Sequence, residues 1–394
     1  MRGRILLAVA LAGGALLAWV AAPALSLRPY IPTVENFDQA LPDAKRLPEA
    51  AAGTGHEDAN FISPPLKAPH EFDLVGVAGE LRHLEIRVRD SGGAWSDWVE
   101  QTDGTPIYVD GAEEAQVRAP FRPEGRLHYV NVSGSAGGIG QRLLSSARVA
   151  INGAFISLAS TPVAEAIAPK PALVPRAGWG ADLPEGGCVP PAPPERGGVR
   201  AGVIHHTVNA NEYAQADAPG IVLGICSFHI HGNGWNDIGY NALVDRFGTL
   251  YEGRAGGLAK PIVGAQAQGF NAQTTAIASI GEHGATGLSP EAQAAVIRYL
   301  AWRLGKAGLN PVTKKSKLTS AGGSQNKYSA GTVVSLPRVI GHRDLGLTEC
   351  PGAALAAQIA TIRRQVQKRI KKYSKCKRKN RKKCKRKKRR ALSR

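Results

Sequence analysis

The sequence predicts two domains: a small all-β, sandwich-like domain, followed by an α/β domain whose mixed central sheet is flanked by helices. Three observations lead to this fold class. The chain has 394 residues, which is more than one typical domain needs. Short alternating runs recur within 66–160, and from residue 199 onwards strand-like and helix-like patterns alternate. A proline-rich segment over 161–198 separates the two patterns and is expected to be a linker.

The N-terminal segment, residues 1–24, has the features of a signal peptide. Two arginines precede an apolar run over 5–21, and small residues at 22–24 fit a cleavage site. An uncleaved membrane anchor is the alternative, because the run approaches the length that spans a bilayer. Both interpretations place the protein in the secreted fraction or at the cell envelope. Residues 25–65 show little periodicity and are expected to form a linker or extended arm.

The β-rich region, residues 66–160, is predicted from its alternation. From Leu84 to Arg89 apolar and charged side chains alternate, as in a strand with one face in water. A turn signal follows at 90–93, and similar short runs recur at 105–109 and 127–132. Regular short strands of this kind indicate a small β-sandwich.

The α/β domain, residues 199–367, begins with strand patterns. A hairpin is predicted from 238–244 and 249–252, a buried strand at 276–281, and a helix at 219–232. These patterns predict a layered domain in which helices pack on a sheet.

Two amphipathic helices are predicted near the end of this domain. The first begins at Ser289, a good helix cap that is followed by proline, and stops at Gly305. The second carries apolar residues in steps of three and four from Leu355 to Ile370. Residues 310–335, rich in Lys, Ser and Gly, are expected to form a surface loop.

The net charge of +19 is concentrated at the C-terminus. Residues 368–394 hold 18 Lys and Arg and no acid, which leaves +1 for the rest of the chain. Such a block repels itself, so we expect a disordered polybasic tail. In an exported protein its expected partners are anionic envelope polymers or lipids, with no specific nucleic acid. A tail that is merely solvated is the alternative.

Five cysteines in an exported chain leave one without a disulfide partner. Cys376 and Cys384 lie eight positions apart and could close a small loop in the tail. Cys188 and Cys226 could pair within the body of the protein. Cys350 is then the remaining cysteine.

His205, His342 and Cys350 form a candidate zinc site. Imidazole and thiolate are good zinc donors, and three protein ligands leave a position for water, as in catalytic sites. A bound Zn²⁺ lowers the pKa of that water and polarises a carbonyl. Three such residues far apart in the chain also arise by coincidence, so spacing alone leaves both interpretations open.

Residues 199–367 resemble the zinc-dependent amidase family that includes phage lysozyme-type amidases and the peptidoglycan recognition proteins. The resemblance lies in five segments that follow the family's order. They are Val-Ile-His-His-Thr at 203–207, Trp-Asn-Asp-Ile-Gly-Tyr-Asn at 235–241, Tyr-Glu-Gly-Arg at 251–254, Gly-His-Arg-Asp at 341–344 and Cys-Pro-Gly at 350–352. The resemblance implies a zinc hydrolase, with Zn²⁺ as cofactor and peptidoglycan as partner. Its expected reaction cleaves the amide between N-acetylmuramic acid and L-alanine.

The resemblance assigns His205, His342 and Cys350 as zinc ligands. Strand alternation agrees that only one of His205 and its neighbour faces a given side. It assigns catalytic roles to Tyr240 and Thr348, because a phenol and a hydroxyl can orient water and stabilise an oxyanion.

Asn241 and Arg254 are expected to bind substrate, although a structural ion pair of Arg254 is an equal alternative. The chain departs from the family pattern at Gln266, where most members have His, and this affects the expected positioning of substrate. His229 and His231 are expected to be packing or surface residues.

Two other functions stay open. One is a non-catalytic peptidoglycan-binding protein, although binding-only members of the family lack the cysteine found here at Cys350. The other is a zinc peptidase that acts on the stem peptides.

Overall fold

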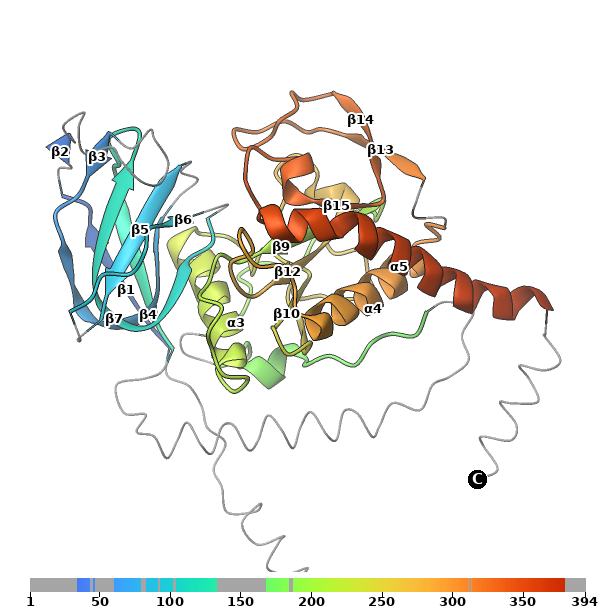
Figure 1. The fold of residues 1–394 in the computed structure, drawn as a ribbon, viewed down its shortest axis with the longest axis horizontal. Helices are drawn as coiled ribbons and strands as arrows, with labels where there is room; N and C mark the ends of the chain where they lie inside the picture. Colours follow the sequence, from blue (N-terminus) through green and yellow to red (C-terminus); the bar gives the residue numbers. More distant parts are fainter. Residues whose placement is uncertain are drawn as a thin grey trace, which may run out of the picture. The chain divides into compact units, whose positions relative to one another are not determined.

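The computed structural model describes most of the chain (Figure 1). The described residues are 34–42, 45–46, 60–78, 83–90, 93–101, 104–132, 168–183, 187–310, 312 and 314–379. The predicted signal peptide, Cys384 and the side chain of Cys376 lie outside them. Within these ranges no helix has both the length and the apolar content needed to cross a bilayer.

The all-β domain is an eight-stranded sheet whose pairings are all antiparallel. Its strands are β1 (Glu35–Ala40), β2 (Lys45–Arg46), β3 (Phe61–Ile62), β4 (Leu66–Val77), β5 (Leu84–Arg89), β6 (Val99–Gln101), β7 (Ile107–Ala119) and β8 (Arg126–Asn131). The register of β4 against β7 shifts between Lys67 and Leu74, which marks a bulge. Apolar side chains of β4, β5, β7 and β8 share one buried core.

The predicted arm over 25–65 contributes β1, β2 and β3 to this sheet, so that prediction is wrong for residues 35–40, 45–46 and 61–62. The longest of these strands covers residues 35–40. These residues form β1, which pairs with β8 along its whole length. Phe37 stacks on Tyr129 with ring centroids 5.0 Å apart. Apart from Phe37 and its terminal Ala the strand is polar, which is why it gave no apolar pattern.

The α/β domain is built on a five-stranded sheet with the order β11-β10-β12-β9-β15. The strands are β9 (Ala201–His206), β10 (Ala242–Val244), β11 (Leu250–Glu252), β12 (Thr274–Ser279) and β15 (Val339–Gly341). Four of them are parallel, and β11 pairs antiparallel with β10, which is the predicted hairpin. The sheet is therefore mixed, as the sequence predicts.

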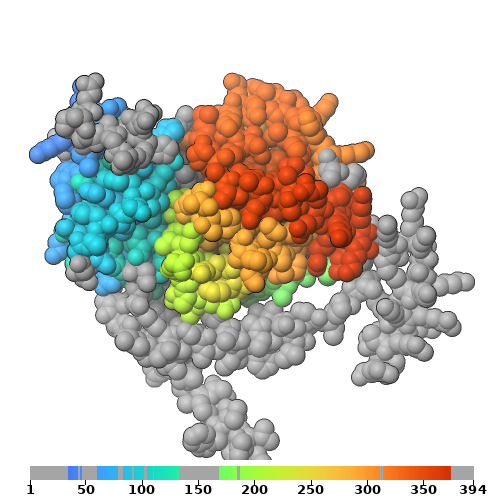
Figure 2. Space-filling view, in the orientation of Figure 1, coloured from blue at the N-terminus to red at the C-terminus, as the bar shows by residue number. Residues whose placement is uncertain are grey.

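Helices cover both faces of this sheet. They are α3 (Ala218–Ser227), α4 (Pro290–Lys306) and α5 (Ala353–Lys379), with short helices η2 (Arg176–Trp179), η3 (Phe228–Gly232), η4 (Asn271–Gln273) and η5 (His342–Asp344). Ile204 and Ile277 pack in one core with α4 and α5, which lie side by side (Figures 1 and 2). Leu243 and Ala278 pack in a second core with α3. Strand alternation thus assigns neighbouring residues to opposite layers.

The predicted linker over 161–198 is wrong for its described part. Val174 bridges to Tyr251 of β11, and Trp179 is buried and donates from Nε1 to the carbonyl of Glu252 at 2.7 Å. Cys188 is also buried. The short helix η2 is the regular helix in this proline-rich part of the described residues, and the apolar residues between the prolines pack against the sheet.

The C-terminal helix continues past the predicted boundary of the tail. α5 ends at Lys379, so the prediction of disorder from residue 368 is wrong for 368–379. Ile370 lies in the same core as Val366, and Tyr373 packs against that core. The apolar stripe therefore extends the helix into the basic segment.

The segment 310–335 also differs from its prediction as a surface loop. It contains β13 (Lys315–Thr319) and the start of β14 (Val333–Pro337), which form an antiparallel pair. Leu318 is buried in a small core with Ile340.

A shared core joins the two domains. Leu74 and Val132 of the β-rich region belong to the same buried cluster as Ile225 and Phe228. A Cβ built at Gly224 of α3 would lie only 2.3 Å from Leu74 Cδ1. Glycine at this position lets the helix and the β-sheet come into direct contact.

Candidate functional site

His205 and His342 lie side by side at the carboxyl ends of two parallel strands. Gly341 of β15 pairs with Ile204 of β9, and a histidine follows each of them, His205 within β9 and His342 at the start of η5. Their ring centroids are 4.6 Å apart. Both follow residues whose side chains pack away from α4 and α5, namely Val203 and Ile340 two positions earlier. Ligand sites of α/β sheets form at this edge of the strands.

Cys350 completes the cluster from the turn before α5. Its Sγ lies 3.6 Å from Nδ1 of His205, and the residue is buried. The backbone N–H of Arg343 donates to the carbonyl of Cys350 at 2.8 Å, which ties the turn to η5. One donor atom each of His205, His342 and Cys350 lie within 4.8 Å of one another. Two nitrogens and a sulfur at this separation suit a single Zn²⁺ with an open position.

A chain of hydrogen bonds fixes the tautomer of His205. Thr274 Oγ1 donates to the carbonyl of Phe270 at 3.0 Å, so it accepts from Nε2 of Gln266 at 2.8 Å. The amide oxygen of Gln266 then faces His205, whose Nε2 donates to it at 2.6 Å. Nδ1 of His205 is left without a proton and faces Cys350, which is the form that binds a metal.

Burial also favours the neutral form of this histidine. Desolvation lowers the pKa of His205 well below its usual value, and the nearby His342 lowers it further. His206 lies in the same strand with its side chain on the opposite face, where Nδ1 accepts from the backbone N–H of His283 at 3.3 Å. Burial lowers the pKa of His206 to about 3. Only His205 of this pair belongs to the cluster.

Tyr240 lies beside the cluster. Its ring centroid is 5.3 Å from that of His205, and its side chain is almost fully buried. The phenolic oxygen lies 2.8 Å from Oγ1 of Thr105, a residue of the β-rich region. A phenol in this position can donate a hydrogen bond to a group bound next to the cluster.

A cavity of about 230 Å³ opens next to these side chains. Its walls come from both domains, and within the α/β domain from three connecting segments and η5. The lining residues are Gly104, Trp235, Tyr240, Ala265, Gln266, Ala267, Gln268, Asn271, Gln325 and His342. The cavity brings the candidate phenol and one candidate ligand to the same space.

Thr348 and Asn241 are held by backbone groups. Thr348 Oγ1 accepts from the backbone N–H of Cys350 at 3.1 Å, so it shapes the turn that carries the ligand. Asn241 is buried, donates to the carbonyl of Ile262 at 3.0 Å and accepts from the N–H of Ala276 at 2.8 Å. Neither Thr348 nor Asn241 lines the cavity. Asn241 therefore links two backbone segments, and its predicted contact with substrate stays a prediction.

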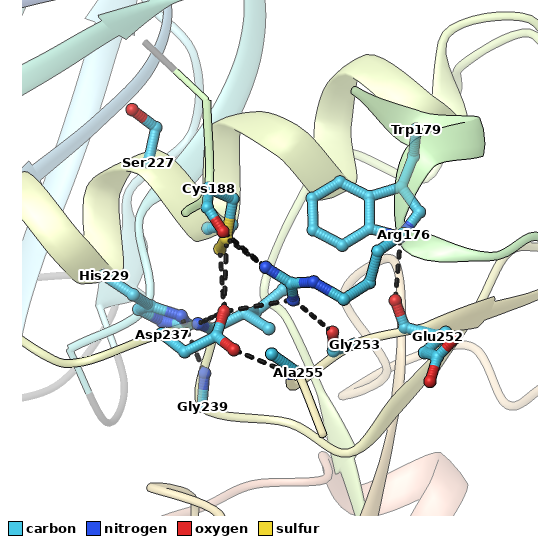
Figure 3. Close-up of a disulfide and its surroundings, with 12 residues drawn as sticks. Arg176, Trp179, Cys188, Ser227, His229, Asp237, Gly239, Glu252, Gly253 and Ala255 are labelled. Atoms are coloured by element: carbon cyan, nitrogen blue, oxygen red, sulfur yellow. Dashed lines mark hydrogen bonds and ion pairs between the residues drawn. A yellow bond between two sulfur atoms is a disulfide. The ribbon is translucent and has the colours of Figure 1, made fainter. Parts of the chain in front are cut away.

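The disulfide between Cys188 and Cys226 lies next to Asp237 (Figure 3). Asp237 accepts from Arg176 Nη1 at 3.1 Å and from the backbone N–H of Ala255 at 2.7 Å. Burial raises the pKa of Asp237, an effect that the charge of Arg176 opposes. This cluster fixes the turn that leads to Tyr240.

Arg254 and His229 lie close to this cluster. Nη1 of Arg254 is buried and has no hydrogen-bond partner among the described residues. Burial lowers the pKa of Arg254, and the charges of Asp237 and Glu195 oppose this effect. His229 is buried, stacks on Trp235 with centroids 4.6 Å apart, and accepts at Nδ1 from a backbone N–H.

The sequence did not predict the contacts that two residues of the site, Gln266 and Thr105, make. At Gln266 the sequence predicts an effect on the positioning of substrate. In the structure the amide oxygen of Gln266 accepts a hydrogen bond from Nε2 of His205. Thr105 gave no signal, because it lies 135 positions from Tyr240 and in the other domain.

Comparisons with known proteins agree with the segments found in the sequence. The family model for N-acetylmuramoyl-L-alanine amidase (Amidase_2) matches residues 195–353. Peptidoglycan-recognition protein SC2 of Drosophila simulans is 30% identical over 161 residues, 40% of this chain and 71% of that protein. The N-acetylmuramoyl-L-alanine amidase of Mus musculus is 31% identical over 207 residues, 50% of this chain and 32% of that protein.

A solved structure with similarity to the chain is Drosophila PGRP-LB, at 25% identity and a TM-score of 0.37, covering 48% of this chain and 92% of that one. The match to protein SC2 extends over more than two thirds of that relative. The chain therefore belongs to the family of N-acetylmuramoyl-L-alanine amidases and peptidoglycan-recognition proteins.

Proposed function

We propose that the protein is a zinc-dependent N-acetylmuramoyl-L-alanine amidase that acts on peptidoglycan. The observation that carries this proposal is the convergence of donor atoms from His205, His342 and Cys350, all buried and within 4.8 Å of one another. The donor set fits zinc, because imidazole nitrogen and thiolate sulfur are its preferred ligands and three of them leave a position open. When bound, zinc supplies Lewis acidity, which lowers the pKa of a water and polarises the carbonyl under attack.

The side chains around the cavity have separate tasks in this proposal. Tyr240 donates a hydrogen bond to the oxyanion that develops on the lactyl carbonyl, and Gln266 keeps Nδ1 of His205 available as a ligand. Thr348 accepts a hydrogen bond from the backbone N–H of Cys350 and so stabilises that turn. Its hydroxyl is also proposed to orient water and stabilise the oxyanion, as the sequence predicts. The peptide amine leaves once the amide carbon–nitrogen bond breaks.

Substrate recognition is proposed to involve Arg254. Its buried Nη1 has no hydrogen-bond partner among the described residues, which is costly for a guanidinium nitrogen, but Arg254 is not one of the residues that line the cavity. A carboxylate of the peptide stem is the matching group. Variant Arg254→Lys should raise KM for stem peptides that carry the carboxylate and leave KM for their amidated forms nearly unchanged.

We also propose that the protein is exported and that its basic end contacts anionic envelope polymers or lipids. Residues 1–24 have the pattern of a signal peptide, and the positive charge is concentrated after residue 367. An uncleaved signal would leave the protein anchored to the membrane. Detection of the mature N-terminus by mass spectrometry distinguishes the two forms.

The second candidate function is peptidoglycan binding without hydrolysis, and the name of relative SC2 describes that protein as one that recognises peptidoglycan. The presence of Cys350 in the donor cluster favours the enzyme over this alternative. A zinc peptidase is the third candidate, and it uses the same donor set on another bond.

One digestion experiment separates these functions. The full-length protein is incubated with purified cell walls, and the products are identified by mass spectrometry. An amidase releases stem peptides with a free L-alanine amine, whereas a peptidase leaves alanine on the sugar and a binding protein releases nothing. Chelation should stop the release and zinc should restore it. Full release in excess chelator would contradict the proposal.

A further inference from the structure

The connection between β6 and β7 of the β-rich region reaches the cavity of the α/β domain. Gly104 of this connection lines the cavity together with Tyr240 and His342. The next residue, Thr105, is only 1% exposed, and its Oγ1 lies 2.8 Å from the phenolic oxygen of Tyr240. The β-rich region therefore contributes a hydroxyl group to the site.

The position of this hydroxyl is fixed from both sides. The side-chain amide of Asn233 donates to the carbonyl of Gly104 at 2.7 Å. Gly104 has a φ of +66°, and a Cβ there would lie 2.8 Å from Nδ2 of Asn233. The shared core of Leu74 with Phe228 packs the two domains together nearby. The connection is thus held in place by hydrogen bonding, backbone conformation and packing.

The chemistry of a phenol determines what this contact does. Tyr240 has one hydroxyl proton, and its oxygen can also accept. If the proton is donated to an oxyanion in the cavity, the same oxygen can only accept from Thr105. The Oγ1–H of Thr105 then donates, which turns the phenolic proton towards the cavity and polarises it.

We infer that Thr105 is a positioning residue for Tyr240, so that the β-rich region completes the site of the hydrolase. This inference rests on the proposed function. It gives the N-terminal domain a role in turnover and not only in targeting. It also predicts that an isolated α/β domain has a phenol with less defined orientation.

The kinetic test compares Thr105→Val, which keeps the shape and loses the hydroxyl, with Thr105→Ser, which keeps the hydroxyl. In the full-length zinc-loaded protein, T105V should lower kcat about tenfold. This is a smaller fall than removal of a direct oxyanion donor causes, because Thr105 acts through Tyr240. The values of KM and zinc content should change little. T105S should recover most of that loss. The control Thr332→Val, at an exposed position outside the cavity lining, should behave as the wild type.

A double-mutant cycle with Tyr240→Phe identifies the route of the effect. Without the phenolic hydroxyl, T105V should cause no further loss of kcat, because Thr105 acts only through that group. An equal loss in both backgrounds would overturn the inference, since it would indicate a general structural effect. A rise of kcat in T105V would also overturn it, since Thr105 would then hold the phenolic proton away from the substrate.

A second measurement does not depend on activity. In protein labelled with ¹³C at the tyrosine ring, the Tyr240 signal is identified by its loss in Tyr240→Phe. T105V should shift this signal, and T105S should leave it near its original position. An unshifted signal in T105V overturns the inference. The variants can show this pattern of shifts relative to the wild type while the wild type releases no product from cell walls. In that case the proposed function is wrong, but the contact between Thr105 and Tyr240 is confirmed.

Discussion

The amide oxygen of Gln266 accepts a hydrogen bond from Nε2 of His205 at 2.6 Å, on the side of the ring away from Cys350. Thr274 determines the direction of the amide, because its hydroxyl is already committed to a backbone carbonyl. This arrangement leaves Nδ1 as the only metal-binding atom of His205. Gln266 therefore acts on the candidate metal site through His205, whereas the sequence predicts an effect on the positioning of substrate.

Gln266→Leu should weaken zinc binding about 10- to 100-fold, since it removes the group that orients and polarises His205. Gln266→Glu keeps an oxygen acceptor and should retain most of the affinity. Competition with a chromophoric chelator measures both values, and Gln365→Leu, at an exposed glutamine of α5, serves as the control. Equal affinities of Gln266→Leu and the wild type would show that the contact does not support the ligand.

Cys350→Ser should lose hydrolysis and most of the bound zinc, while binding of muropeptides persists. A serine hydroxyl is a much poorer zinc donor than a thiolate, and the change of volume is small. Elemental analysis gives the metal content and calorimetry gives the muropeptide affinity. Stoichiometric zinc together with normal turnover in this variant would contradict the donor set.

The double variant Cys188→Ser/Cys226→Ser should be less stable but still bind zinc. The disulfide closes a loop with a sequence separation of 38, and such a bond stabilises by up to about 4 kcal/mol in the chain-entropy description. Asp237 keeps its bonds from Arg176 and Ala255 in the variant, so the turn before Tyr240 should remain. Urea unfolding measures the loss, and zinc titration checks the site. Loss of zinc binding would show that the disulfide positions the ligands.

Acid should destabilise the protein through His229. Burial lowers the pKa of this histidine to about 3, so it stays neutral when folded and becomes protonated below about 6.5 only when unfolded. The unfolded state then binds more protons, and the free energy of unfolding falls as the pH falls from 6.5 towards 3.

Lowering the pH from 7 to 5 should reduce the free energy of unfolding by about 2 kcal/mol through His229 alone. Urea unfolding in excess chelator at both pH values measures the difference without metal binding. In His229→Gln the difference should be smaller by that amount, whatever the overall stability of the variant. An unchanged difference would show that His229 is not the source.

Two C-terminal truncations should have different effects. Removal of 380–394 takes away 10 Lys and Arg and should weaken binding to anionic wall polymers while leaving thermal stability unchanged. Removal of 368–394 also deletes Ile370, which is buried in the core. This truncation should lower the free energy of unfolding by roughly 2 kcal/mol. Binding at several salt concentrations and thermal unfolding check the two effects. Equal stability of both truncations would contradict the role of Ile370.

Local patterns predicted much of the fold. The steps from Leu355 to Ile370 define the face of α5 that packs on α4, and these apolar residues are buried as the periodicity requires. The strand Glu35–Ala40 was missed because edge pairing uses backbone groups, which leave no mark on side-chain composition. The packing of Trp179 was missed because a proline-rich segment suggests a linker, whereas the short helix η2 within it docks on the α/β domain.

The sequence by itself determined the fold class, the residue types of the candidate metal cluster and the family to which the chain belongs. Hydrophobic periodicity and motif order are properties of neighbouring residues, so they can be read without coordinates. Only the tertiary structure decided that His205 and His342 share one face at adjacent strand ends, that Gln266 lies behind His205, and that Thr105 reaches Tyr240. These contacts depend on how strands pair and how domains pack. Residues that are far apart in the sequence determine their free energy together, so no single local segment reveals them.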